Sequence, residues 1–143
     1  MNKKSKQFNI ELFVVCDYAM FSQDGKLSLL GIFDRIFTKT LPANHPRMIV
    51  AATLVGNGNE ECKVNIEFIA PDGSLVMQNQ SPSMMVKLGP NGKGNVISEI
   101  VGFPIQTTGQ YKIRMLINGE SRREIPLYAQ KVVVNEGFGK QPN

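Results

Sequence analysis

The chain alternates from end to end between short apolar stretches and turn-forming residues, and this rhythm limits what it can fold into. Runs of roughly five to ten residues, many with apolar side chains at every second position, are separated by Gly, Pro and Asp-Gly steps. Side chains of a β-strand alternate between two faces, whereas an amphipathic helix needs apolar residues three or four positions apart. The sequence therefore predicts an antiparallel, all-β domain without a helix.

The spacing of these runs indicates a sandwich. Asp24-Gly25 and Asn118-Gly119 are strong turn signals because Gly takes the positive φ that tight turns need. The predicted strands are 8–16, 26–37, 48–55, 62–68, 75–77, 83–88, 95–102, 109–118 and 121–134. Eight or nine strands of this kind favour a two-sheet antiparallel sandwich, either immunoglobulin-like or jelly-roll, because a single open sheet would leave one apolar face in water.

Three segments carry more specific predictions. The run 26–37 is apolar on both faces, which predicts either a central strand covered on both sides or a strand that bends at Gly31. Segment 41–47 contains two prolines and His45, and we expect it to be irregular. The glycine-rich stretch 89–94 is predicted to be a hairpin loop. Tyr111 follows Gly109 as in the corner of immunoglobulin-like domains, where the phenol caps backbone, although an ordinary core tyrosine fits the pattern equally well.

Length and charge suggest one domain with a basic lead. The 143 residues, 42% of them hydrophobic, are enough for a single core. We expect residues 1–7 to be a flexible basic lead, 8–134 to be one β-sandwich domain and 135–143 to be a C-terminal tail. The net charge of +4 includes three lysines of the lead, and the arginines are not interleaved with aromatic residues, so no nucleic acid is predicted as a partner.

The remaining sequence signals concern the compartment. No apolar run is long enough to cross a bilayer and no secretion signal is recognisable, so we expect a cytoplasmic protein with no membrane partner. Alternation places Cys16 in phase with Ile10, Leu12 and Val14, and it places Cys62 in phase with Val64. Two inward-facing structural thiols are therefore favoured over a disulfide.

Few residues could carry chemistry. His45 is the single histidine, which excludes a multi-histidine metal site. Asp17 and Asp34 each follow an apolar run directly, so we expect them to be partly buried, either capping a strand end or serving as acid and base together with His45. Calcium binding would need Asp17, Asp24, Asp34 and Asp72 to gather at one end, yet no spaced ligand series is present. We therefore predict no catalytic residue, no metal and no cofactor.

A resemblance extends over most of the chain, from about residue 10 to residue 130. It rests on Cys16-Asp17-x-Ala19, on Gly25-Lys26-x-x-x-Leu30-Gly31-x-Phe33-Asp34, on His45-Pro46 and on Pro126-Leu127-Tyr128. Together these motifs resemble an uncharacterised bacterial domain family of unknown function. The resemblance implies a small cytoplasmic β-sandwich, and it supplies no site.

Two function classes remain. A sandwich offers edge strands and end loops, so the favoured hypothesis is a non-catalytic binding or assembly module that contacts a protein partner or associates with itself. The alternative is a hydrolase or lyase that uses Asp17, Asp34 and His45 at one end of the sandwich, which requires the three side chains to converge. A sugar-binding module is disfavoured by the absence of Trp and the presence of only three Tyr.

Overall fold

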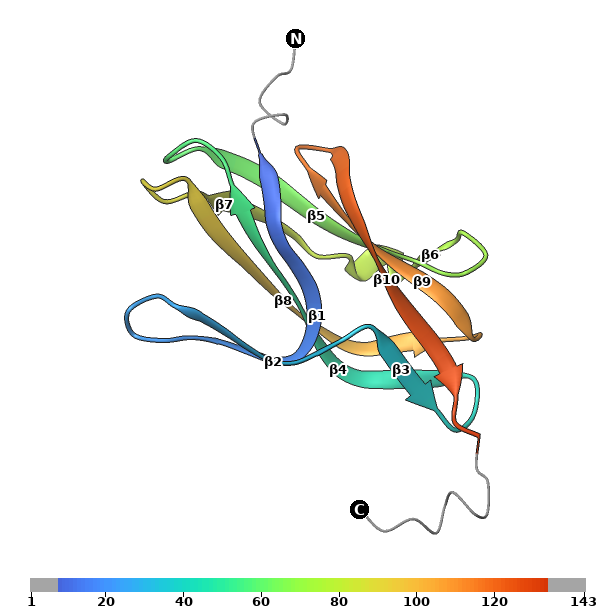
Figure 1. The fold of residues 1–143 in the computed structure, drawn as a ribbon. Helices are drawn as coiled ribbons and strands as arrows, with labels where there is room; N and C mark the ends of the chain where they lie inside the picture. Colours follow the sequence, from blue (N-terminus) through green and yellow to red (C-terminus); the bar gives the residue numbers. More distant parts are fainter. Residues whose placement is uncertain (1–7, 134–143) are drawn as a thin grey trace.

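A computed structural model describes residues 8–133, and the predicted lead 1–7 and the whole predicted tail 135–143 lie outside the described residues. In the described part, ten strands form two sheets and the one helical element is the short 3-10 turn Gln78–Gln80, so the predicted all-β sandwich is confirmed (Figure 1). Nothing among these residues is a helix long and apolar enough to cross a membrane.

The first sheet has four strands in the order β2-β1-β4-β8, all antiparallel. Its strands are β1 (Asn9–Phe21), β2 (Leu27–Phe33), β4 (Ala43–Val55) and β8 (Lys93–Ile105). The central strand β1 continues past its pairing with β4 as a hairpin with β2, and its residues there are mostly exposed. In β4 the residues Met48–Ala52 are all buried, because alternate side chains belong to the main core and to a second cluster on the other face.

The second sheet has six strands. Its path is β3-β10-β9-β5-β6, with β7 also paired to β5. The bounds are β3 (Arg35–Thr38), β5 (Glu61–Ile69), β6 (Leu75–Val76), β7 (Ser83–Lys87), β9 (Gly109–Ile117) and β10 (Glu120–Lys131). All its pairs are antiparallel except β3 with β10, which is parallel.

The core lies between the sheets and confirms the alternation in β5. Cys62, Val64, Ile66 and Phe68 are all buried there. Tyr111 is also buried, and its hydroxyl donates a hydrogen bond to the Thr107 carbonyl at 2.8 Å, so it combines the two roles considered for it.

The segment 26–37 is not one strand. The chain leaves the first sheet after Phe33 and enters the second sheet at Arg35, so Asp34 is the crossing point between β2 and β3. The expectation of a central strand covered on both sides was wrong, because β2 lies at the edge of its sheet. Gly31 does take a positive φ of 70°, which supports the predicted irregularity at this residue.

Segment 41–47 is more regular than predicted, because β4 begins at Ala43 and includes His45 and Pro46. Here β4 pairs only with β8, since its pairing with β1 begins at Ile49, and Pro46 itself has no partner in the register. A proline without an amide hydrogen is tolerated where one side of the strand is unpaired.

Two further expectations need correction. The loop 89–94 is not a hairpin within one sheet, because β7 belongs to the second sheet and β8 to the first. Cys16 is buried and unbridged, as Cys62 is, but it does not face the main core. It packs with Ile49 and Ala51 in a second cluster, while its neighbours Phe13 and Val15 face the sandwich interior.

Candidate functional site

Asp17 and His45 come together although they are far apart in sequence. They line a hollow of about 360 Å³ at one end of the sandwich, together with Arg35 and the apolar side chains of Phe33, Ile36 and Phe37. His45 comes from the first residues of β4, Asp17 from the point where β1 leaves the sandwich, and Arg35 from the start of β3. An acid, an imidazole and a guanidinium therefore share one hollow.

The imidazole of His45 is half-buried in an apolar setting. Its ring centroid lies 5.9 Å from that of Phe33, and its Nε2 atom is buried without a hydrogen-bond partner among residues 8–133. Burial lowers the pKa of His45 from its ordinary value, while the negative charge of Asp17 and a hydrogen bond with the backbone of Arg47 act in the opposite direction. The neutral imidazole is thus favoured over the charged form.

Asp34 lies elsewhere. It lines a separate hollow of about 410 Å³ between β1, β2 and β10, with Phe13, Ile32 and Pro126 among its neighbours. Both Asp34 and Asp17 are exposed, so the expected partial burial was wrong. Because the structure unites only two of the three residues, the acid–base set that the hydrolase or lyase alternative required is not assembled in one hollow.

The acidic cluster that calcium would need is not formed either. Asp24 lies at the tip of the β1–β2 hairpin and Asp72 lies in the turn between β5 and β6. Across residues 8–133, no group of three or more His, Cys, Asp or Glu side chains could hold a metal ion. Asp72 serves its own turn by accepting hydrogen bonds from the Ser74 amide at 2.9 Å and from the Ser74 hydroxyl at 2.6 Å, and these bonds lower its pKa.

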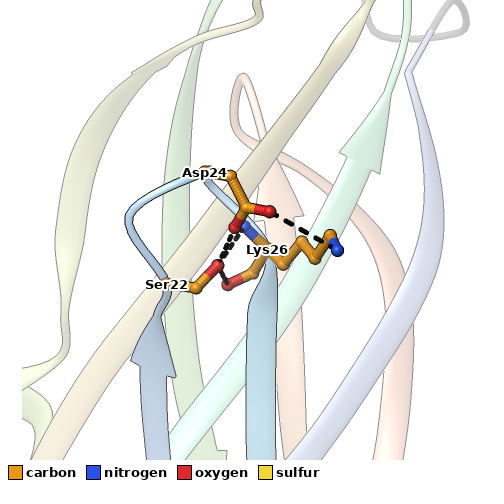
Figure 2. A network of polar contacts seen from close by, with 3 residues as sticks. All are labelled: Ser22, Asp24 and Lys26. Atoms are coloured by element: carbon orange, nitrogen blue, oxygen red, sulfur yellow. Dashed lines mark hydrogen bonds and ion pairs between the residues drawn. The ribbon is translucent and has the colours of Figure 1, made fainter.

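The feature that stands out is the hairpin arm, which we define as residues 18–32 of β1, β2 and the turn between them. Figure 1 shows it (blue) projecting to one side, away from the remaining strands of both sheets. Its tip is fixed by a polar network, drawn in Figure 2. The Ser22 hydroxyl donates to the Asp24 carboxylate, the Lys26 amide donates to the Ser22 hydroxyl at 3.1 Å, and Lys26 forms an ion pair with Asp24 at 3.4 Å. The hydrogen bond from Ser22 lowers the pKa of Asp24.

The base of the arm is packed, but most of the arm is not. Ala19 and Leu29 contact the outer cluster of Cys16, Ile49 and Ala51, which holds the arm against the first sheet. The Arg47 guanidinium lies over the ring of Tyr18, with its Cζ atom 5.6 Å from the ring centroid. Five large apolar residues of the arm nevertheless have about half or more of their surface in water: Tyr18 49%, Met20 50%, Phe21 52%, Leu30 60% and Ile32 59%. Monomeric proteins rarely expose large apolar patches, and such patches are often functional.

The outer edge of the arm, β2, also differs from the other sheet edges. Its seven residues include no charge and no proline. At the other edge of the first sheet, β8 carries Glu99 and Pro104, and in the second sheet the edge strands β3, β6 and β7 have four, two and five residues. Short strands, charges and prolines protect edges from pairing with another chain, so β2 is the unprotected one of these edges.

Pro126 shows how such protection works next to β3. The Tyr128 amide donates to the Asp34 carbonyl at 2.7 Å, so amides of alternate β10 residues point toward β3. Pro126, two residues earlier, has no amide hydrogen to offer on that same side. The part of β10 that extends beyond β3 therefore resists further pairing.

The arm does not follow from the sequence pattern, because a strand that is apolar on both faces predicts burial. The only available signal was the mirror-like placement of apolar residues on both sides of Asp24-Gly25, which predicts a long hairpin but not its projection from the sandwich. Projection depends on where β1 separates from β4. Their pairing stops at Cys16 and Ile49 although β4 continues to Ala43 alongside β8, and this divergence is set by the tertiary structure.

Comparison with known proteins extends this picture. The model of a family of unknown function, DUF6941, matches residues 11–130. The chain belongs to this family. A search of curated proteins finds no match. Among solved structures, the alkylpurine DNA glycosylase AlkC of Pseudomonas fluorescens, bound to DNA containing an abasic site analog, is similar with a TM-score of 0.53 at 12% identity. The similarity covers 87% of this chain but 30% of that protein, and at this identity it shows the fold alone.

Proposed function

We propose that this member of the family is a non-catalytic protein-binding or assembly module and that the hairpin arm is its binding surface. The observation that carries the proposal is the exposure of Tyr18, Met20, Phe21, Leu30 and Ile32 on one projecting element. Apolar area in water is unfavourable, and a partner that covers it gains about 25 cal/mol for each Å² removed. The cytoplasmic location and the immunoglobulin-like topology predicted from the sequence stay predictions.

The arm offers a partner two kinds of contact, namely backbone hydrogen bonds along the edge of β2 and apolar side-chain contacts. An extended partner strand can add to β2 through backbone hydrogen bonds, while the apolar side chains of the arm supply affinity and specificity. The hollow with Asp17 and His45 lies next to the arm base, because Asp17 directly precedes Tyr18. Its polar groups would then border the covered surface rather than perform chemistry.

The proposal is tested by photo-crosslinking in living cells. Benzoylphenylalanine replaces Leu30 on the arm, and in a matched control it replaces Met85, which is 66% exposed on β7 and outside the arm. We expect a covalent protein adduct from position 30 and none from position 85. Absence of a protein adduct at position 30, or equal adducts at both positions, would contradict the proposal.

A further inference from the structure

We propose that the partner of the arm is a second copy of this chain, paired antiparallel through β2 about a two-fold axis at Leu30. This inference rests on the proposed function, because it names the occupant of the same surface. Three properties of β2 carry it: the direction of its free backbone groups, the charges at its two ends and the exposed apolar side chains between them.

The turn determines which backbone groups of β2 are free. The Ser22 amide donates to the Lys26 carbonyl at 2.9 Å, so these two residues form a hydrogen-bonded pair. The register continues with Met20 opposite Ser28 and Tyr18 opposite Leu30. Hydrogen-bonded and non-bonded pairs alternate in an antiparallel ladder, so the even-numbered residues of β2 bond to β1. The odd-numbered residues Leu27, Leu29, Gly31 and Phe33 direct their amide and carbonyl groups to the open edge.

A two-fold axis at Leu30 uses these groups in a regular ladder. Leu29 then pairs with Gly31 of the other copy, and Leu27 pairs with its Phe33, each through free backbone groups. Between them lie the non-bonded pairs, Leu30 with Leu30 and Ser28 with Ile32. Side chains of non-bonded pairs approach most closely, so the two residues of β2 that are about 60% exposed, Leu30 and Ile32, become covered.

The same register matches the charges. Lys26 directly precedes β2 and Asp34 directly follows it. Pairing about Leu30 places Lys26 of each copy opposite Asp34 of the other, whereas a parallel arrangement would place like charges together. Asp34 forms no hydrogen bond through its side chain and no ion pair within residues 8–133, and Lys26 has one highly exposed partner, Asp24. This self-complementarity is what favours a second copy over an unrelated strand.

A charge exchange between two variants tests the pairing. In Lys26→Glu or Asp34→Lys alone, each homodimer would contain two like-charge contacts, and we expect its dissociation constant to rise about tenfold or more at low salt. Mixing the two variants restores both opposite-charge contacts, so a mixed dimer should form with nearly the wild-type affinity. Lys87→Glu, an exposed charge reversal on β7, is the control and should leave the dimer unchanged.

Light scattering behind size-exclusion chromatography and native mass spectrometry of the mixture provide the readout, and circular dichroism verifies that each variant is folded. A wild-type dimer that both single variants weaken and the mixture restores supports the inference. A dimer insensitive to the exchange overturns the β2 pairing, and a monomer at all concentrations overturns self-association. If the monomer still crosslinks to a different protein from position 30, the proposed function stands and only the second copy is refuted.

Discussion

Removing the hydroxyl of Tyr111 tests whether the corner between β8 and β9 is held by one side chain. The Tyr111 side chain is 2% exposed, and its ring packs edge-on against Phe103 with centroids 5.7 Å apart. Its hydroxyl donates to the Thr107 carbonyl at 2.8 Å, and the Thr107 amide approaches the same oxygen at 3.5 Å. Tyr111→Phe keeps the ring and its packing and removes only these polar contacts.

The structure sets the size of the effect. A hydrogen bond of this kind contributes about 1 kcal/mol to stability, and a fully buried carbonyl left without a donor costs up to about 3 kcal/mol. Thr107 is exposed, so water can replace the lost donor and the lower figure applies. We expect Tyr111→Phe to lower the free energy of unfolding by about 1 kcal/mol, with a fall in Tm of about 2 to 5 °C for a domain of this size.

Urea denaturation followed by circular dichroism measures this difference, and an unchanged slope with denaturant shows that the unfolded state is comparable. Tyr128→Phe is the matched control: Tyr128 lies under the Arg35 guanidinium at 5.1 Å, and its hydroxyl makes no hydrogen bond within the described part of the chain. It should change stability by less than about 0.5 kcal/mol. Equal losses in both variants, or no loss in Tyr111→Phe, would refute the reasoning.

Two further predictions concern the arm base and the adjoining hollow. The pKa of His45 is lower in the folded state than its ordinary value of 6.5, so the unfolded state binds more protons as the pH falls. The contribution of neutral His45 to the free energy of unfolding should therefore be fully present well above pH 6.5 and be lost as the pH drops below 6.5. In His45→Gln, the free energy of unfolding from urea titrations should fall less between about pH 7.5 and 5.5 than in the wild type. A pH dependence equal to that of the wild type would contradict the role given to His45. Gly31→Ala should lower the free energy of unfolding by about 1 to 2 kcal/mol, because φ at Gly31 is 70° and a Cβ there would lie 2.5 Å from Asp17 Oδ2. Thermal unfolding measures this change, and a loss below about 0.5 kcal/mol would argue against strain at this residue.

The local features were predictable from sequence because they depend on neighbouring residues. Alternation from Cys62 to Phe68 determines which face of β5 is buried, and Asp24-Gly25 determines the hairpin turn. The hydrogen bond of Tyr111 spans four residues, so a short motif could indicate it. In each case the interacting groups lie close in sequence. The alternation of side chains along a strand, or the φ preference of a turn residue, is then sufficient to predict the feature.

The candidate site depended on contacts that no local pattern encodes. Asp17 and His45 share a hollow only because β1 and β4 are neighbours in one sheet, and Asp34 leaves that hollow because the chain crosses there to the second sheet. Burial at Leu30 depends on whether another strand lies beside β2, and apolar character alone cannot tell a covered strand from an uncovered one. The sequence by itself thus determined that strands form and where they turn. Only the tertiary structure decided which apolar side chains remain in water, because burial is a property of the neighbours that the fold supplies.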